Sequence, residues 1–135
     1  MSETRVGMND LIESVHGDLG SYARLAKQPM SVVRGFEHSL DDHPLVLTTA
    51  SLCKVLTAFQ RHEVSPDLVQ EWASFIRWGF LPGDTEQGRP IAIDYDPRAE
   101  DRLVEVIARL DELGDPIDGE IDDDELVTMI GTLAD

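Results

Sequence analysis

The stretch DPRAEDRLVEVIARLDELG, residues 96–114, carries the clearest helical pattern in the chain. Its apolar side chains recur at steps of three and four and form one stripe: Leu103, Val106, Ile107, Leu110 and Leu113. Asp96-Pro97 suits a capping residue followed by the first residue of a helix, and Gly114 suits the end of that helix. We therefore predict an amphipathic helix from Pro97 to Gly114 that buries this stripe in a core.

Two further helices are predicted before it. Ser65-Pro66-Asp67 is a start signal, because serine accepts a bond from a free amide, proline suits the first position and an acid favours the positive end. This helix ends at Gly79, and the residues of its apolar face are Val69, Trp72, Ala73, Ile76 and Phe80. The preceding helix is capped by Thr48 or Thr49, ends near His62 and buries an apolar stripe of its own. The residues of that stripe are Leu52, Val55, Leu56 and Phe59.

The two ends of the chain add shorter patterns. From Met8 to Leu40, glycine and proline interrupt the apolar steps, so two or three helical pieces are expected. A last helix is marked by Leu126, Met129, Ile130 and Leu133. Residues 91–95 alternate as an extended segment does, and this segment either pairs with residues 44–47 or lies across the helices.

Together these patterns predict an all-α fold, a small helical bundle of five or six helices with at most a marginal short strand pair. The length of 135 residues suits a single helical domain over residues 1–135. Hydrophobic residues make up 41% of the chain, which is enough to form a core.

The charge is strongly acidic and unevenly distributed, with a formal net charge of −16 at pH 7. Residues 1–80 hold 7 basic and 10 acidic side chains, whereas residues 81–135 hold 4 and 17, a net charge of −13. Such a charge disfavours direct contact with nucleic-acid phosphates or an anionic membrane, and it favours a basic protein partner.

An acidic segment, residues 114–125, lies between the last two predicted helices and is comparable with a calcium-binding loop. With Gly119 at the sixth loop position, Asp118, Asp122 and Glu125 occupy the fifth, ninth and twelfth positions. A glycine and a proline then replace the oxygen ligands of the first and third positions, which disfavours tight calcium binding. The favoured interpretation is a solvated linker whose acids open the last helix at its positive end, and weak cation binding stays open.

The same acids suit another role, as a surface that docks a basic protein such as the active site of a toxin. Trp78 is a candidate aromatic anchor, because it leans away from the apolar stripe that contains Trp72. The alternative for Trp78 is packing against Tyr95 or the N-terminal helices of the same chain. The candidate partner-binding residues are Asp94, Asp96, Asp101, Asp118, Glu120, Asp122, Asp123, Asp124 and Trp78.

No catalytic or metal-binding signature is found. The histidines lack zinc-type spacing, no serine stands in a Gly-x-Ser-x-Gly elbow, and no glycine loop suits a phosphate. Cys53 lies among the apolar residues of its helix and is predicted to pack as a small hydrophobe. We expect no enzyme, no cofactor and no metal. The single cysteine, the lack of a secretory pattern and the short apolar runs favour a cytoplasmic protein without a membrane span.

Between Ser51 and Leu133, several sequence features follow one another in an order that is also found in a known protein family. Residues 64–69 read VSPDLV, residues 71–73 read EWA, and an Asp115-Pro116 turn precedes the final amphipathic helix. The other residues that carry the likeness are Leu52, Leu56, Phe59, Glu105 and Leu110. This three-fifths of the chain resembles small bacterial immunity proteins of the colicin D immunity type, including those of contact-dependent inhibition systems. The resemblance implies a helical bundle that blocks the active site of one cognate toxin, often a tRNA-cleaving nuclease, with acidic side chains.

Two functions are therefore considered. The first is an immunity or inhibitor protein that binds a cognate nuclease toxin through an acidic surface, without binding nucleic acid or a membrane itself. The alternative is a non-inhibitory adaptor or antitoxin-like regulator that binds a partner through an apolar groove between helices, with Trp78 near its rim. The oligomeric state is left open by the sequence.

Overall fold

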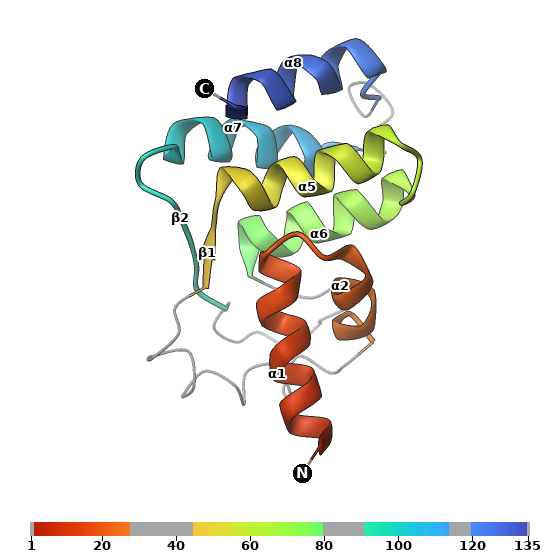
Figure 1. Ribbon diagram of the computed structural model, residues 1–135, viewed down its shortest axis with the longest axis vertical. Helices are drawn as coiled ribbons and strands as arrows, with labels where there is room; N and C mark the ends of the chain where they lie inside the picture. The colour runs from red at the N-terminus through yellow and green to blue at the C-terminus, as the bar shows by residue number, and fades with distance from the viewer. Residues whose placement is uncertain (1, 28–44, 80–90, 114–119, 135) are drawn as a thin grey trace.

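The computed structural model describes residues 2–27, 45–79, 91–113 and 120–134 (Figure 1). These residues form six helices and one pair of short strands, which confirms the predicted small, mostly helical bundle. The elements are α1 (Ser2–Val15), α2 (Leu19–Leu25), β1 (Leu45–Leu47), α5 (Thr49–Gln60), α6 (Pro66–Trp78), β2 (Ile93–Tyr95), α7 (Glu100–Asp111) and α8 (Asp123–Ala134).

The helices are stacked along the long axis of the molecule (Figure 1). Helix α8 lies at one end and packs on α5 and α7. Below them, α6 packs most extensively on α7 and also contacts α5 and α2. Helices α1 and α2 pack on each other at the opposite end. Helix α6 therefore joins the N-terminal helix pair to the rest of the bundle, together with β1, which contacts α1.

One continuous hydrophobic core runs through this stack. Its largest fully buried side chains include Trp72, Tyr22 and Phe75, and the rings of Tyr22 and Phe75 lie 5.8 Å apart between centroids. The predicted apolar stripes are buried in this core through Leu52, Val55, Leu56, Phe59, Val69, Ala73, Ile76, Leu103, Val106, Ile107, Leu110, Leu113, Leu126, Met129 and Leu133. The periodicity thus identified the buried faces of α5, α6, α7 and α8.

None of the helices in the described ranges is long and apolar enough to cross a membrane.

The two strands form a parallel pair in which Leu45 is opposite Ile93 and Leu47 is opposite Tyr95. Of the two possibilities considered for residues 91–95, pairing with the segment before α5 is the one that the chain adopts. The α5–α6 hairpin lies between the two strands in sequence, as a parallel connection requires.

Local signals set the ends of α5 and α6 as predicted. The side chain of Thr48 accepts a hydrogen bond from the Ser51 amide at 3.2 Å, and Ser65 accepts one from the Leu68 amide at 3.2 Å. Gly79 ends α6 in the left-handed conformation, with φ of 80°. These caps use only neighbouring residues, so they were readable from the sequence.

The predicted start of α7 at Asp96-Pro97 is wrong, because the helix begins at Glu100. The backbone amide of Asp96 donates to the Leu47 carbonyl at 2.9 Å, which extends the contact between the strand segments by one residue. The Asp96 carboxylate accepts from the Arg98 amide, and its carbonyl accepts from the Ala99 amide, so a turn separates the strand from the helix. Helix α7 ends at Asp111, while the predicted stop Gly114 and the predicted core residue Phe80 lie outside the described residues.

The N-terminal pattern resolves into α1 and α2, which are separated at Gly17. Gly17 has φ of 94°, and a Cβ atom at this position would lie 2.4 Å from the Ser51 carbonyl oxygen of α5. Glycine therefore meets two requirements here, a left-handed backbone and a close approach to α5. The rest of the predicted N-terminal pattern, residues 28–40, lies outside the described residues.

Replacing Gly17 by alanine is expected to lower the free energy of unfolding by about 2 kcal/mol or more, because backbone strain and the clash with Ser51 act together. Gly131 is the matched control, since it lies inside α8 and a Cβ there would meet no atom within 4 Å. Gly131→Ala is expected to stabilise the fold by roughly 0.5–1 kcal/mol. Urea unfolding measures both variants, and equal changes would contradict the close packing of Gly17 on α5.

Asp18 caps α2 by accepting a hydrogen bond from the Ser21 amide at 3.1 Å, and this bond lowers the pKa of its carboxyl below 3.8. Because the folded state has the lower pKa, the contribution of the cap is present above that pH and is lost as the pH falls. Asp18→Ala is expected to cost about 1 kcal/mol at pH 7 and less near pH 3. Asp18→Asn is the control, because it caps without titrating. Urea unfolding at both pH values tests this, and a cost that does not change with pH would count against the cap.

Candidate functional site

Helices α7 and α8 form an antiparallel pair, and predicted partner-binding acids lie on it and on the segments that lead into each helix. Near the end of α7, Arg109 pairs with Glu125 at the start of α8. Near the start of α7, Arg102 donates to the Thr132 carbonyl, close to the end of α8, at 3.2 Å. These two contacts connect α7 and α8 near both ends of the pair.

One group of predicted acids lies where the chain enters α7. Asp94 is exposed on β2, and Asp101 is exposed in the first turn of α7. The carboxylate of Asp96 is only partly exposed and serves the turn before α7, where it also lies 3.5 Å from Arg98. Asp94 and Asp101 are therefore the available carboxylates of this group.

A second group lies at the start of α8. Glu120, Asp122, Asp123 and Asp124 are all exposed, and Asp122 accepts a hydrogen bond from the Glu125 amide at 2.8 Å. Asp123 and Asp124 stand in the first turn of α8, where a negative charge is favoured by the helix dipole. Asp118 lies outside the described residues.

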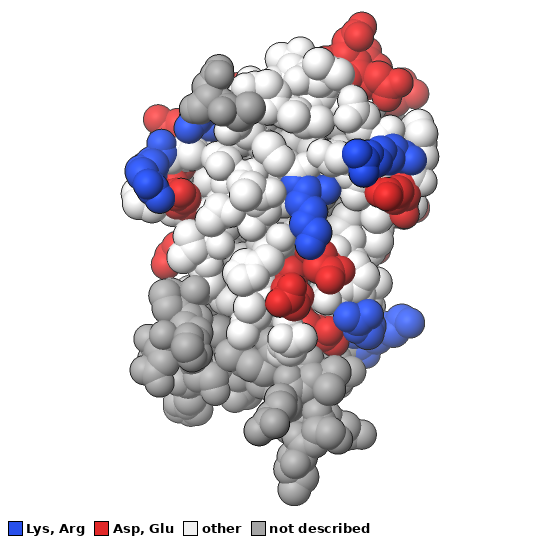
Figure 2. Space-filling view, viewed as in Figure 1, with Lys and Arg blue, Asp and Glu red and all other residues white. Residues whose placement is uncertain are grey.

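The structure keeps the two groups apart. At 1.5 Å per residue, Asp101 and Arg109 lie about 12 Å apart along α7, and the second group lies beyond Arg109. Figure 2 shows separate acidic groups divided by uncharged surface on the face that it presents. The predicted residues thus form two acidic ends of one helix pair and not one continuous patch.

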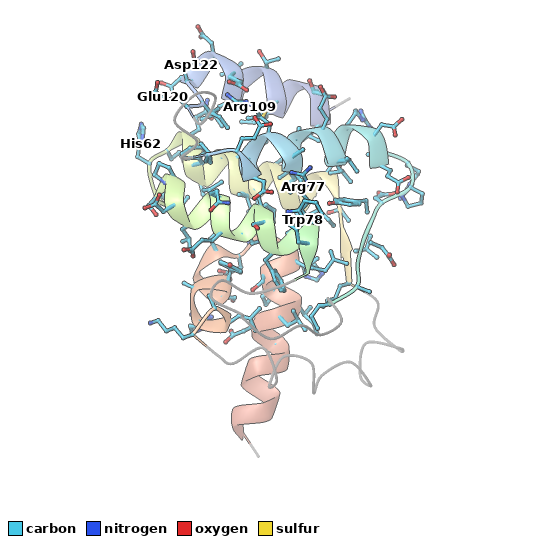
Figure 3. All side chains as sticks on the ribbon, turned by 180° about the vertical axis from the view of Figure 1, so that it is seen from behind. His62, Arg77, Trp78, Arg109, Glu120 and Asp122 are labelled. Atoms are coloured by element: carbon cyan, nitrogen blue, oxygen red, sulfur yellow. The ribbon has the colours of Figure 1, made fainter. Side chains whose placement is uncertain are left out.

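Arg109 is the central residue of the second acidic end, and sequence reasoning missed it. Its guanidinium donates to both carboxylate oxygens of Glu125, to Glu112 at 3.0 Å and to the Glu120 carbonyl at 2.7 Å (Figure 3). The hydrogen bonds to Glu125 and Glu112 raise the pKa of Arg109 above its usual value. Only the spacing from Arg109 to Glu112 was visible in the sequence, because the contact with Glu125 depends on the tertiary fold.

A groove with a volume of about 440 Å³ lies between α7 and α8. Val106, Ala108 and Met129 contribute apolar surface to it, and Glu105, Glu112 and Glu125 contribute carboxylates. The paired residues Arg109 and Glu125 themselves line the groove, and Thr132 lines it on the side of α8. Trp78 is not among the residues that line it, so the predicted combination of an apolar groove with Trp78 at its rim does not occur at this groove.

Trp78 is exposed, with 55% of its surface accessible, which is the first of the two possibilities considered for it. Its indole NH donates to the Asp111 carboxylate at 3.2 Å, and the Arg77 guanidinium lies 4.7 Å from the centre of its ring. Asp111 also accepts from Arg77 and Gln70, which ties the end of α7 to α6. Trp78 is therefore held in place on the outer surface of the α6–α7 seam (Figure 3).

Asp122 and Glu125, the described acids of the segment that was compared with a calcium-binding loop, already have partners within the protein. Asp122 caps α8, and the Glu125 carboxylate is bound by Arg109. No group of three or more side chains suited to a metal ion occurs within residues 2–27, 45–79, 91–113 and 120–134. Cys53 is half-buried against the core, and this burial raises the pKa of its thiol, as expected for a packed small hydrophobe.

Arg109→Gln is expected to lower the free energy of unfolding by about 1 kcal/mol, because the pair with Glu125 is bidentate but partly exposed. A double-mutant cycle with Glu125→Gln is expected to give a coupling energy of about 1 kcal/mol that falls in concentrated salt. Urea unfolding of the four proteins measures it. Arg102→Gln is the control on the same helix, and it is expected to show little coupling to Glu125. A coupling that is indistinguishable from that control would contradict a stabilising pair between Arg109 and Glu125.

Comparisons of this chain with protein families, with curated proteins and with solved structures find no match. The resemblance to colicin D type immunity proteins thus stays a prediction that rests on the sequence features described above.

Proposed function

We propose that this protein is an immunity-type inhibitor that binds a basic protein, a cognate nuclease toxin, through the carboxylates of the β2–α7–α8 unit. The observation that carries this proposal is the division of charge within the fold. Described residues 91–113 and 120–134 hold 12 acidic and 3 basic side chains, a net charge of −9. Described residues 2–27 and 45–79 hold 7 acidic and 6 basic side chains, a net charge of −1.

This division of charge makes the described β2–α7–α8 unit strongly negative. Solubility alone requires only a dispersed surface charge, whereas a charge concentrated on one structural unit creates a directed potential. Such a potential steers a basic partner toward that unit and accelerates association. A nuclease needs a basic cleft to hold its phosphate substrate, so it is a partner of matching charge. The single cysteine of the chain fits a reducing compartment, and we place this encounter in the cytoplasm.

An elongated cleft is matched better by two acidic groups at the ends of one helix pair than by a single flat acidic patch. Asp94 and Asp101 at one end, and Asp123 and Asp124 at the other, present carboxylates separated by more than the length of two helical turns. These carboxylates take the place of successive phosphates along the cleft of the toxin. The inhibitor then excludes the substrate by occupying its electrostatic contacts.

The alternative function is a non-inhibitory adaptor that binds its partner through apolar contacts. The groove between α7 and α8 supports this alternative, because its surface is largely apolar. An adaptor of this kind would bind with little dependence on salt, whereas the inhibitor would bind weakly at high salt.

The proposal is tested by purifying the tagged protein with its partner at low and high salt, followed by association kinetics with that partner. Replacing Asp123 and Asp124 by lysine is expected to slow association at least about tenfold and to reduce its salt dependence. The control replaces Glu13 and Glu71 by lysine, which makes the same change in total charge outside the acidic unit. Equal effects of the two double variants, or no effect of either, would refute the assignment of the surface.

A further inference from the structure

The groove between α7 and α8 has an unusual chemical composition, because its side-chain donors are already used within the protein. Arg109 donates to Glu125, Glu112 and the Glu120 carbonyl. The hydroxyl of Thr128 donates to the Asp124 carbonyl at 3.0 Å, and that of Thr132 donates to the Thr128 carbonyl at 2.9 Å. Both hydroxyls are thus satisfied by the backbone of α8, and an occupant of the groove meets few free donors.

What the groove offers is apolar surface together with carboxylate acceptors. Ala108 is the half-buried apolar residue of the lining, and the core residues Val106 and Met129 reach it with 4% and 9% of their surface accessible. Glu105 is exposed at the wall, and the side chain of Glu112 is 51% exposed although it also accepts from Arg109. A site with apolar surface and anionic acceptors binds a group that is apolar and carries a neighbouring cation, and it repels an anion.

The length of the groove limits the size of what enters it. On the side of α7 the lining runs from Glu105 to Glu112, seven residues apart, which is about 10 Å of helix. This length accommodates one or two side chains from a partner helix or loop. A second copy of this chain is disfavoured, because it would bring another net charge of −16 to the same acidic end.

We infer that the groove between α7 and α8 receives a basic segment of the protein partner, which inserts an aliphatic or aromatic side chain against Val106 and Met129. Lysine or arginine side chains of the same segment then lie against Glu105 and against Glu112, one at each carboxylate. This inference rests on the proposed function, because it takes the partner to be a basic protein. It adds that affinity comes from an anchored apolar side chain, while the acidic ends of the helix pair supply the association rate.

The test uses a short amphipathic peptide of leucine and lysine as the probe, with a peptide of leucine and glutamate as its control. We expect the lysine peptide to shift the NMR methyl signals of Val106, Ala108 and Met129, and the glutamate peptide to leave them unchanged. Ala108→Leu fills the groove without a change in charge and is expected to weaken binding at least about tenfold. Val104→Leu is the matched control, because Val104 is an exposed residue of α7 that does not line the groove.

A second variant keeps the test valid if Ala108→Leu perturbs the fold. Glu105→Gln combined with Glu112→Gln is expected to weaken lysine-peptide binding and to reduce its salt dependence. Methyl shifts that follow the concentration of the protein instead of the peptide would assign the groove to a second copy and overturn the inference. Equal binding by the Ala108→Leu and Val104→Leu variants would overturn it too. If the Asp123 and Asp124 reversals still slow the partner in that case, the proposed function stands without the groove.

Discussion

The burial of Trp72 on α6 is the interaction on which the rest of the architecture depends. The indole ring is fully buried, and its NH donates to the Ser14 carbonyl of α1 at 2.7 Å. An indole NH in an apolar core needs an acceptor, and the Ser14 carbonyl in the last turn of α1 supplies one while it also accepts from the Gly17 amide at 3.1 Å. The buried hydroxyl of Ser14 donates to the Asp10 carbonyl, so it also has a hydrogen-bond partner. The N-terminal helices are thereby fixed against the same helix that supports α7.

Much of the fold was predictable because its signals are local. The caps at Thr48 and Ser65 act on amides three residues away, and the apolar stripes repeat with the period of a helix. The start of α7 was not predictable in this way. Asp96 and Pro97 form a good local start signal, but the Leu47 carbonyl, far away in sequence, takes the Asp96 amide and delays the helix.

In the candidate site, too, the features set by local sequence were predictable and those set by tertiary contacts were not. The exposure of Trp78 and of the acids at the start of α8 followed from composition and helix periodicity. The distance between the two acidic ends, the groove between α7 and α8 and the role of Arg109 depend on how the helices pack, which no local pattern encodes. In the sequence, Arg109 is one cation among many acidic residues and changes the net charge only slightly. In the folded protein it binds Glu125 at the start of α8, next to the second acidic group.

The parallel register of β1 and β2 also has a consequence for the order in which the chain folds. Among the described residues Leu45 pairs with Ile93, so the α5–α6 hairpin must leave the ribosome before this pair can close. A contact between residues so far apart in sequence closes a long loop and forms late unless the intervening helices have already shortened it. The strand pair is thus expected to form after the helices. A chain released from the ribosome before residue 95 would leave β1 without its partner strand β2.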